Sequence, residues 1–169
     1  MIFLTVGTQL PFDRLVRAVD EWAASRGRRD IFGQISDPGA EGYRPKNFDW
    51  VEDLSPAEFE ARFQEASHIV SHAGMGTIIS ALGAEKPLLI MPRRAHLGEQ
   101  RNDHQQATAE RFRTRPGILT ALDEGEFPEK MDLLLADTLS TEHPGPTRTP
   151  IGRFADRRLT DRIRSMILD

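Results

Sequence analysis

The sequence predicts one α/β domain, a Rossmann-like doubly wound parallel sheet. Short, continuous apolar runs are typical of strands that a parallel sheet buries on both faces. Amphipathic segments of helical period alternate with these runs, and glycine turns follow several of them. This alternation favours a doubly wound sheet with right-handed crossovers. A chain of 169 residues fits a single hydrophobic core.

The expected elements follow from the apolar periodicity. Residues 2–6 form an apolar run, and the helix that follows it ends at Gly27. In that helix Asp20 is one of the polar residues expected to face solvent, opposite the apolar stripe. Ser55 and Glu58 form a capping box at the start of the next helix. We expect strands at residues 2–6, 30–35, 48–51, 68–71, 87–91 and 117–119, and further helices at 55–66, 77–82, 103–112 and 128–139.

The C-terminal part of the chain differs from the domain of residues 1–139. Residues 140–150 are rich in proline, which is typical of a linker. In residues 151–169 apolar side chains recur at helical spacing, with five arginines on the rest of the surface. This amphipathic helix either docks on its own domain or contacts a partner, and both interpretations stay open.

The composition excludes several classes of function. Lys and Arg number 22 against 26 Asp and Glu, a net charge of −4, so the chain lacks the positive field that draws proteins to nucleic acid. It contains no cysteine, which excludes a disulfide framework, a thiolate zinc site and a cysteine nucleophile, and favours a cytoplasmic setting. No apolar run approaches the roughly 20 residues of a membrane span. Work at a membrane would therefore need something other than a span of this kind to hold the protein there.

Two strand-to-helix turns have the composition of an anion site. Gly7-Thr8 follows the first strand, and residues 71–77 follow the fourth. In an open parallel sheet such turns present backbone N–H groups and a helix N-terminus to a ligand. Neither turn matches the dinucleotide fingerprint or the phosphate loop. On spacing alone, a tight connection is the more common explanation of either turn.

Polar residues near the second turn strengthen the anion-site interpretation. His72 offers an N–H donor, Thr77 offers a hydroxyl at the start of a helix, and the polar stretch 102–106 begins another helix after the next strand. Arg93 and Arg94 would add positive charge beside a diphosphate. The alternative is a buried His72 satisfied by backbone, a solvated helix start and two solvated arginines.

Four segments together resemble a known family. They are Ser71-His72-Ala73-Gly74-Met75-Gly76-Thr77-Ile78-Ile79-Ser80-Ala81-Leu82, Lys86-Pro87-Leu88, Pro92-Arg93-Arg94 and Asn102-Asp103-His104-Gln105. This pattern resembles the C-terminal, donor-binding half of the family 28 glycosyltransferases. The opening Phe3-Leu4-Thr5-Val6-Gly7-Thr8-Gln9 is similar to that of the small subunits of this group, Alg13 and the exopolysaccharide protein PssE. The resemblance covers residues 1–112.

The resemblance implies a GT-B fold, of which this chain is the C-terminal, donor-binding half. It implies a metal-independent hexosyltransferase that uses a UDP-sugar as donor and no cofactor. The acceptor-binding half would be a membrane-attached subunit similar to Alg14 or PssD, which supplies the general base and holds the chain at the inner face of the plasma membrane. The implied reaction moves a glucuronosyl or N-acetylglucosaminyl group to a polyprenyl-linked acceptor in exopolysaccharide assembly. Without its partner the chain is expected to self-associate as a homo-oligomer.

Carried over residue by residue, the resemblance assigns roles in donor binding. His72, Gly76 and Thr77 take positions that contact the donor phosphates, and His104-Gln105 take positions on the sugar hydroxyls. The full substrate-binding set is Gly7, Thr8, His72, Gly74, Met75, Gly76, Thr77, Arg93, Asn102, Asp103, His104 and Gln105.

The carboxylate that usually binds the ribose in this family is missing. Ser80 occupies its position, and Glu85 and Glu99 are the candidates to replace it. This departure favours an alternative function, that of a non-catalytic UDP-sugar-binding or regulatory subunit. A third interpretation, a complete small enzyme such as a nucleotide-sugar epimerase, lacks evident acid and base groups for both faces of a sugar.

Overall fold

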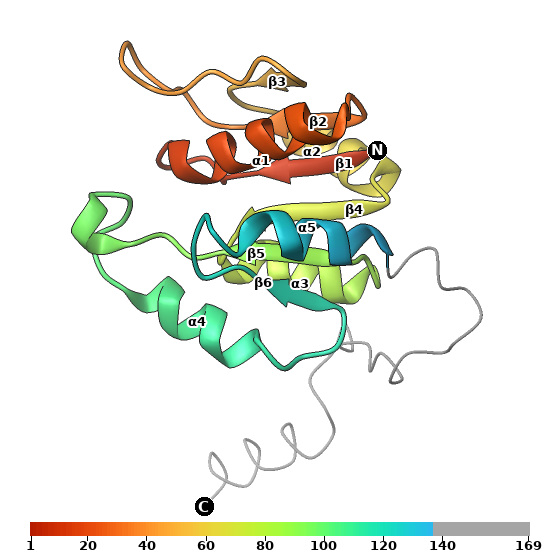
Figure 1. Cartoon of the computed structure of the whole chain (residues 1–169), viewed down its shortest axis with the longest axis vertical. Coiled ribbons are helices and arrows are strands. Elements are labelled where there is room, and N and C mark those ends of the chain that lie inside the picture. The colour runs from red at the N-terminus through yellow and green to blue at the C-terminus, as the bar shows by residue number, and fades with distance from the viewer. Residues whose placement is uncertain (137–169) are drawn as a thin grey trace, which may run out of the picture.

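The fold is a six-stranded, all-parallel sheet (Figure 1). The computed structural model describes residues 1–136, so the predicted linker at 140–150 and helix at 151–169 lie outside the described residues. The strands are β1 (Ile2–Thr5), β2 (Ile31–Gln34), β3 (Asp49–Val51), β4 (His68–His72), β5 (Leu88–Met91) and β6 (Ile118–Thr120). Their order, β3-β2-β1-β4-β5-β6, is that of a Rossmann fold.

The helices divide between the two faces of the sheet. They are α1 (Asp13–Arg26) and α5 (Phe127–Ala136) on one face, α2 (Pro56–Glu65), α3 (Met75–Gly83) and α4 (His104–Phe112) on the other, and a short 3-10 helix η1 (Ala95–Leu97) before α4. Figure 1 shows α1 and α5 in front of the sheet, with the carboxyl ends of the strands to the left. This arrangement confirms the predicted doubly wound α/β class. Within residues 1–136, none of these helices combines the length and apolar character that crossing a bilayer requires.

Side chains of the sheet alternate between two cores, one on each face. In β1, Ile2 and Leu4 pack in the core with α1 and α5, whereas Phe3 packs in the core with α2 and α3. Strands buried on both faces are what the continuous apolar runs predict. All six strands lie where those runs were expected, within one residue at each end.

Helix α3 begins two residues earlier than expected. Gly74 is its N-cap in an extended conformation, with φ −89° and ψ 132°, and Met75 is the first helical residue. The expected start near Thr77 is wrong, because glycine does not exclude the first helical turn and Gly76 lies within it. Because α3 starts earlier, its N-terminus lies closer along the chain to His72, the last residue of β4.

The loop between β2 and β3, residues 35–48, is anchored by a buried carboxylate of α1. Asp20 is 2% exposed and accepts hydrogen bonds from the Tyr43 hydroxyl (2.7 Å), the Lys46 N–H (3.0 Å) and the Asn47 N–H (2.8 Å). The expected solvent-facing position of Asp20 is therefore wrong. The loop folds over this side of α1, and its donors replace water around the carboxylate.

Replacing Ser55 with alanine is expected to destabilise the protein by about 1 kcal/mol, because it removes the cap of α2. The Ser55 hydroxyl accepts the Glu58 N–H (3.3 Å), and the Glu58 carboxylate accepts the Ser55 N–H (2.9 Å). This geometry confirms the capping box expected from the sequence. Urea unfolding measures the change in the free energy of unfolding.

The matched control is Ser80→Ala on the exposed side of α3, where no cap is lost. Alanine is the better helix former there, so the free energy of unfolding should stay the same or rise slightly. Equal effects of the two substitutions would contradict the capping role of Ser55.

Candidate functional site

The carboxyl ends of β1 and β4 open a crevice between two neighbouring strands. β1 leads into α1 on one face of the sheet, and β4 leads into α3 on the other face, so their connecting turns diverge. A cavity of about 300 Å³ lies at this point. It is lined by Val6, Gly7, Thr8, Gln9, Leu10, His72, Gly74, Arg93, Gln100, His104 and Gln105.

The turn after β1 is held in one orientation by side chains from the neighbouring strand. Gly7 has a φ of +81°, a conformation that favours glycine. Its carbonyl accepts hydrogen bonds from Ser36 Oγ (2.7 Å) and Gln34 Nε2 (3.1 Å), and Thr5 Oγ1 donates to Gln34 Oε1 (2.7 Å). Because C=O and N–H point opposite ways in a trans peptide, the Thr8 N–H points away from Gln34 and Ser36.

The imidazole of His72 lies between two glycines. A Cβ on Gly7 would lie 3.1 Å from His72 Cε1, and a Cβ on Gly74 would overlap His72 Nε2. The ring therefore fits only because residue 74 has no side chain. The sequence predicts that Gly74 lets the backbone approach a ligand, and in the structure Gly74 first makes room for His72.

Burial keeps the His72 ring neutral. The removal of water, and secondarily the positive charge of Arg93, lower the pKa of His72 to about 4, against a weaker opposing effect of the Thr5 carbonyl. Its Nδ1 is buried and makes no hydrogen bond of ordinary geometry with any described residue. A neutral imidazole carries one N–H and one acceptor nitrogen, so His72 brings a polar ring without charge to the cavity.

Helix α3 presents an open N-terminus at the same edge of the sheet. No side chain caps it, and the first N–H to bond back along the helix is that of Ile78, to Gly74 C=O (3.2 Å). The N–H groups of Met75, Gly76 and Thr77 therefore have no acceptor within the helix. Such groups, together with the helix dipole, attract an anion. None of these three residues lines the 300 Å³ cavity, so a ligand that reaches them must extend beyond it.

The buried side chain of Arg93 is bonded to the backbone of neighbouring loops. It is 3% exposed, and its two terminal nitrogens donate four hydrogen bonds, all to backbone carbonyls. These bonds use every N–H of the terminal nitrogens, and the residue also lines the cavity, so its predicted role in binding a diphosphate stays a prediction. Burial lowers the pKa of Arg93 to about 10, which leaves it protonated at neutral pH. Arg94 likewise donates to a carbonyl, that of Leu122 (3.0 Å).

Gln105, in the first turn of α4, presents one defined group to the cavity. The residue is 2% exposed, and its Oε1 accepts the Arg93 N–H (3.2 Å). Since a backbone N–H requires an acceptor, the oxygen must face Arg93, and the amide Nε2 is left for the cavity. His104 is exposed and lines the same cavity.

The structure gathers part of the predicted binding set and leaves the rest outside. Asn102 and Asp103 do not line the cavity. Asn102 Oδ1 accepts the His104 N–H (3.3 Å) and Asp103 Oδ1 accepts the Ala95 N–H (2.9 Å), so both shape the loop before α4. The predicted residues that line the cavity are Gly7, Thr8, His72, Gly74, Arg93, His104 and Gln105.

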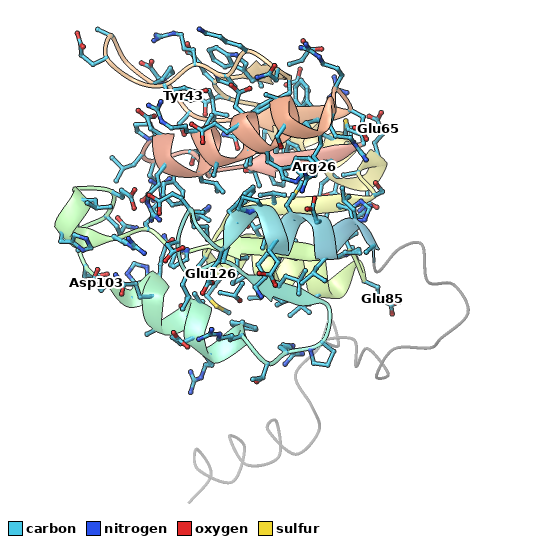
Figure 2. The ribbon with its side chains drawn as sticks, in the orientation of Figure 1. Arg26, Tyr43, Glu65, Glu85, Asp103 and Glu126 are labelled. Atoms are coloured by element: carbon cyan, nitrogen blue, oxygen red, sulfur yellow. The ribbon has the colours of Figure 1, made fainter. Side chains whose placement is uncertain are left out.

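Neither candidate ribose carboxylate lines the cavity. Figure 2 shows Glu85 at the opposite end of the sheet from Asp103, beyond the last turn of α3. Glu99 accepts two hydrogen bonds from the Arg14 guanidinium (2.8 Å each) and one from the Arg94 N–H (2.8 Å), which ties the loop before α4 to α1. The structure thus places neither carboxylate in the cavity, and the replacement of the missing carboxylate by one of them stays a prediction.

Sequence reasoning missed the residues that hold the turn after β1. Gln34 ends β2 and Ser36 follows it with a φ of +58°. The available signal was a polar side chain at the carboxyl end of an otherwise apolar strand, where ligands of parallel sheets bind. Gln9 and Gln100 also line the cavity. Both lie in loops, where no periodic pattern marks them.

A larger cavity of about 700 Å³ lies beside α1. It is lined by Glu99 but by none of the residues in the predicted substrate-binding set. Its central charges pair with one another, since Arg14 bonds to Glu99 (2.8 Å) and Glu124 (3.2 Å). Throughout residues 1–136, no group of three or more His, Asp or Glu side chains is placed to hold a metal ion. We place the candidate site in the smaller cavity, where the glycine turns, the neutral histidine and the oriented amide meet.

Comparison with known proteins assigns a family to most of the chain. The family described as Glycosyltransferase family 28 C-terminal domain matches residues 1–135, which confirms the resemblance drawn from the sequence. Comparison with curated proteins gives no match. Among solved structures, Acinetobacter baumannii MurG aligns with a TM-score of 0.56 and 18% identity, over 81% of this chain and 40% of that protein.

Two further structures show how much of each relative the chain spans. A Methanocaldococcus jannaschii UDP-GlcNAc 2-epimerase, solved in complex with UDP-GlcNAc and UDP, aligns with a TM-score of 0.56 and 11% identity, over 99% of this chain and 44% of that one. The NMR solution structure of ALG13 aligns with a TM-score of 0.51 and 17% identity, over 96% of this chain and 93% of ALG13. The chain thus spans less than half of MurG and of the epimerase. At these identities the likeness shows the fold alone.

Replacing Gly74 with alanine is expected to destabilise the protein by about 1–3 kcal/mol. The added methyl group would overlap His72 Nε2 and force the ring to move. Urea unfolding measures the lost stability, and NMR shifts of the His72 ring protons report the displacement.

Gly76→Ala serves as the paired control, because a Cβ at Gly76 meets no atom within 4 Å. This substitution should raise stability slightly, since alanine favours the helix, and should leave the His72 signals in place. If Gly74→Ala proved as stable as Gly76→Ala, the described packing of His72 would be wrong.

Stability is expected to fall as the pH decreases from 6.5 to about 4, in part because of His72. The pKa of His72 is 6.5 in an unfolded chain and about 4 in the folded protein. The unfolded chain therefore binds more protons within this window, and the contribution of His72 to stability is complete above it. The loss attributable to His72 is on the order of 3 kcal/mol at the lower end. Urea unfolding across this pH range measures it.

His72→Asn removes the titrating group and should reduce the loss of stability over this pH range by the amount attributed to His72. Burial also lowers the pKa of His68. This residue is present in both proteins and contributes equally to the pH dependence of each. An unchanged pH dependence in His72→Asn would show that the folded protein does not hold His72 in a buried, neutral form.

Proposed function

This chain belongs to the family of glycosyltransferase family 28 C-terminal domains, and on that premise we propose that it is the donor-binding subunit of a two-component glycosyltransferase. It binds a UDP-sugar at the carboxyl edge of the sheet and acts with a membrane-attached, acceptor-binding subunit similar to Alg14 or PssD. The pair transfers a glucuronosyl or N-acetylglucosaminyl group to a polyprenyl-linked acceptor in exopolysaccharide assembly, at the cytoplasmic face of the plasma membrane.

One juxtaposition carries this proposal: the Gly7 turn, His72 and Gln105 line a single cavity. They come from the end of β1, the end of β4 and the helix that follows β5, so three adjacent strands contribute. Doubly wound sheets bind nucleotides in such a crevice, where neighbouring strands send their helices to opposite faces.

The donors at this edge suit a diphosphate leaving group. When the bond between the anomeric carbon and the diphosphate oxygen breaks, negative charge grows on that oxygen and is stabilised best by preorganised donors. The Thr8 N–H, the single N–H of His72 and the open N-terminus of α3 supply such donors. The base that removes the proton from the acceptor hydroxyl belongs to the partner subunit, on the side from which the acceptor arrives.

Gln105 and His104 bind the sugar in this proposal. Gln105 presents amide N–H donors, because its oxygen is bound to the Arg93 N–H. These donors match the oxygen of a sugar hydroxyl or of a sugar carboxylate. A sugar that lacked the matching oxygen would leave a buried donor unpaired, which lowers its affinity.

The two-component part of the proposal is supported by the alignment over 93% of ALG13, together with the sequence resemblance to the small subunits of this group. It also explains how a donor-binding domain acts on a lipid-linked acceptor. The acceptor is held by the partner, and the domain described here supplies the activated sugar.

A second candidate function is a non-catalytic UDP-sugar-binding or regulatory subunit. The observation that favours it is the missing ribose carboxylate. Ser80 stands at that position, Glu85 lies at the far end of the sheet, and Glu99 is paired with Arg14. Weaker binding of the nucleotide would suit a regulatory subunit better than an enzyme.

Thermal unfolding with a nucleotide panel tests the ligand class. UDP and UDP-sugars are expected to raise Tm, because a ligand that binds only the folded state stabilises it, whereas NAD and ATP are expected to leave Tm unchanged. Gln105→Ala should weaken UDP-sugar binding about tenfold while sparing UDP, since the amide faces the sugar.

Gln64→Ala on the exposed side of α2 provides the comparison variant and should bind every nucleotide as the wild type does. A Tm shift with NAD or ATP, but none with uridine nucleotides, would overturn the proposal. Sugar transfer measured with the partner subunit present then separates the two candidates: binding without turnover favours the regulatory subunit.

A further inference from the structure

We infer that Arg93 is a positioning residue that sets the geometry of the donor cavity without contacting the donor. The inference deepens the proposed function and rests on it for the identity of the ligand. Three walls of the cavity meet at Arg93: the turn after β1, the loop before α4 and the first turn of α4.

The guanidinium of Arg93 joins the turn after β1 to the loop before α4. Its Nη2 donates to the carbonyls of Val6 (2.8 Å) and Leu10 (2.6 Å). Its Nη1 donates to the carbonyls of Pro11 (2.7 Å) and Glu99 (3.2 Å). Val6 and Leu10 lie at the two ends of the turn, so one planar group holds both ends of the segment that lines the cavity.

Arg93 lines the cavity, but its terminal nitrogens are occupied by protein carbonyls. Its Cζ lies 4.7 Å from the centre of the Phe12 ring, and the residue is 3% exposed. A diphosphate that bonded to its terminal nitrogens would displace backbone carbonyls and leave them buried without donors, which is costly. The terminal nitrogens therefore act on the ligand through the groups that they hold.

The backbone of Arg93 sets the direction of Gln105. Its N–H donates to Gln105 Oε1 (3.2 Å), and the reversed amide would place two donors against each other. Gln105 consequently turns Nε2 to the cavity. The main-chain N–H of Arg93 thus orients the first turn of α4, and its side chain orients the turn after β1 and the loop before α4.

The charge of Arg93 also acts on His72. It lowers the pKa of the ring, second in effect to burial, while the Thr5 carbonyl favours the protonated form. Within residues 1–136, Arg93 is the charged side chain with a resolved effect on this ring. The buried cation therefore helps to keep His72 neutral.

Lysine cannot reproduce this arrangement. Its ammonium carries three donors on one nitrogen, whereas the carbonyls around Arg93 are served by two nitrogens of a planar fork. Arg93→Lys keeps the positive charge and loses the geometry, and Arg93→Met loses both. The two substitutions therefore separate positioning from electrostatics.

NMR titration of the full chain with UDP measures both contributions. Arg93→Lys is expected to weaken UDP binding about tenfold. It should also shift the Thr8 N–H and the Gln105 side-chain amide while the pKa of His72 stays near 4. Arg93→Met is expected to weaken UDP binding at least as much and to raise the pKa of His72 toward 6.5.

Arg94→Lys is the neighbouring control, because the Arg94 side chain donates to the Leu122 carbonyl and does not line the cavity. It should leave UDP affinity and the Thr8 and Gln105 signals unchanged. If Arg93→Lys gave the same result as Arg94→Lys, the positioning role would be overturned.

The wild-type protein supplies a test that does not depend on the folding of any variant. A guanidinium bound to four carbonyls rotates slowly, so the Arg93 Nη protons are expected as separate signals that UDP leaves in place. Averaged signals, or a through-bond coupling from these protons to a UDP phosphorus, would overturn the inference. If UDP does not bind the wild type, the proposed function fails. The responses of Thr8, Gln105 and His72 to Arg93→Lys then still decide whether Arg93 positions the cavity.

Discussion

The pairing of β1 with β4 in the middle of the sheet is the constraint on which the site depends. Strands β2 and β3, which follow β1, are added on one side of it, and strands β5 and β6, which follow β4, are added on the other side. The helices after β1 and β4 therefore cover opposite faces of the sheet. The two connecting turns therefore diverge and leave a crevice at the carboxyl edge. Gly7 lies on one side of this crevice and His72 on the other, and the open end of α3 and the start of α4 are arranged around it.

The walls of the crevice are irregular loops, and buried polar side chains give these loops a defined shape. Ser36 donates to the Gly7 carbonyl, and Arg93 donates to carbonyls of two loops. Asp20 accepts N–H groups from the loop of residues 35–48. Loop backbone that is removed from water needs such partners, since an unsatisfied buried group costs about 1–3 kcal/mol. Polar residues of the interior thus hold the loops, and the groups that they leave unpaired face the cavity.

The site consequently offers an anion oriented neutral donors in place of exposed positive charges. Arg93 is covered by carbonyls, His72 is uncharged at neutral pH, and the N–H groups at the start of α3 have no cap. Donors of this kind stabilise charge that develops during a reaction because they need no reorganisation. Their effect depends on orientation, so in our proposal residues that hold the loops, such as Ser36 and Arg93, determine how well the ligand is bound.

The sheet, its helices and the turns that form the site were predictable from the amino-acid sequence. Apolar runs and helical periods are local properties, so the strands were predictable to within one residue, and Gly7 and His72 could be assigned to one edge. The roles of Arg93 and Asp20 were decided only by the tertiary structure. Each depends on contacts between distant positions, and Arg93 and Val6 are 87 positions apart. A local pattern marks a polar residue as exposed or ligand-binding, whereas only the packed chain shows which polar groups have already paired with one another.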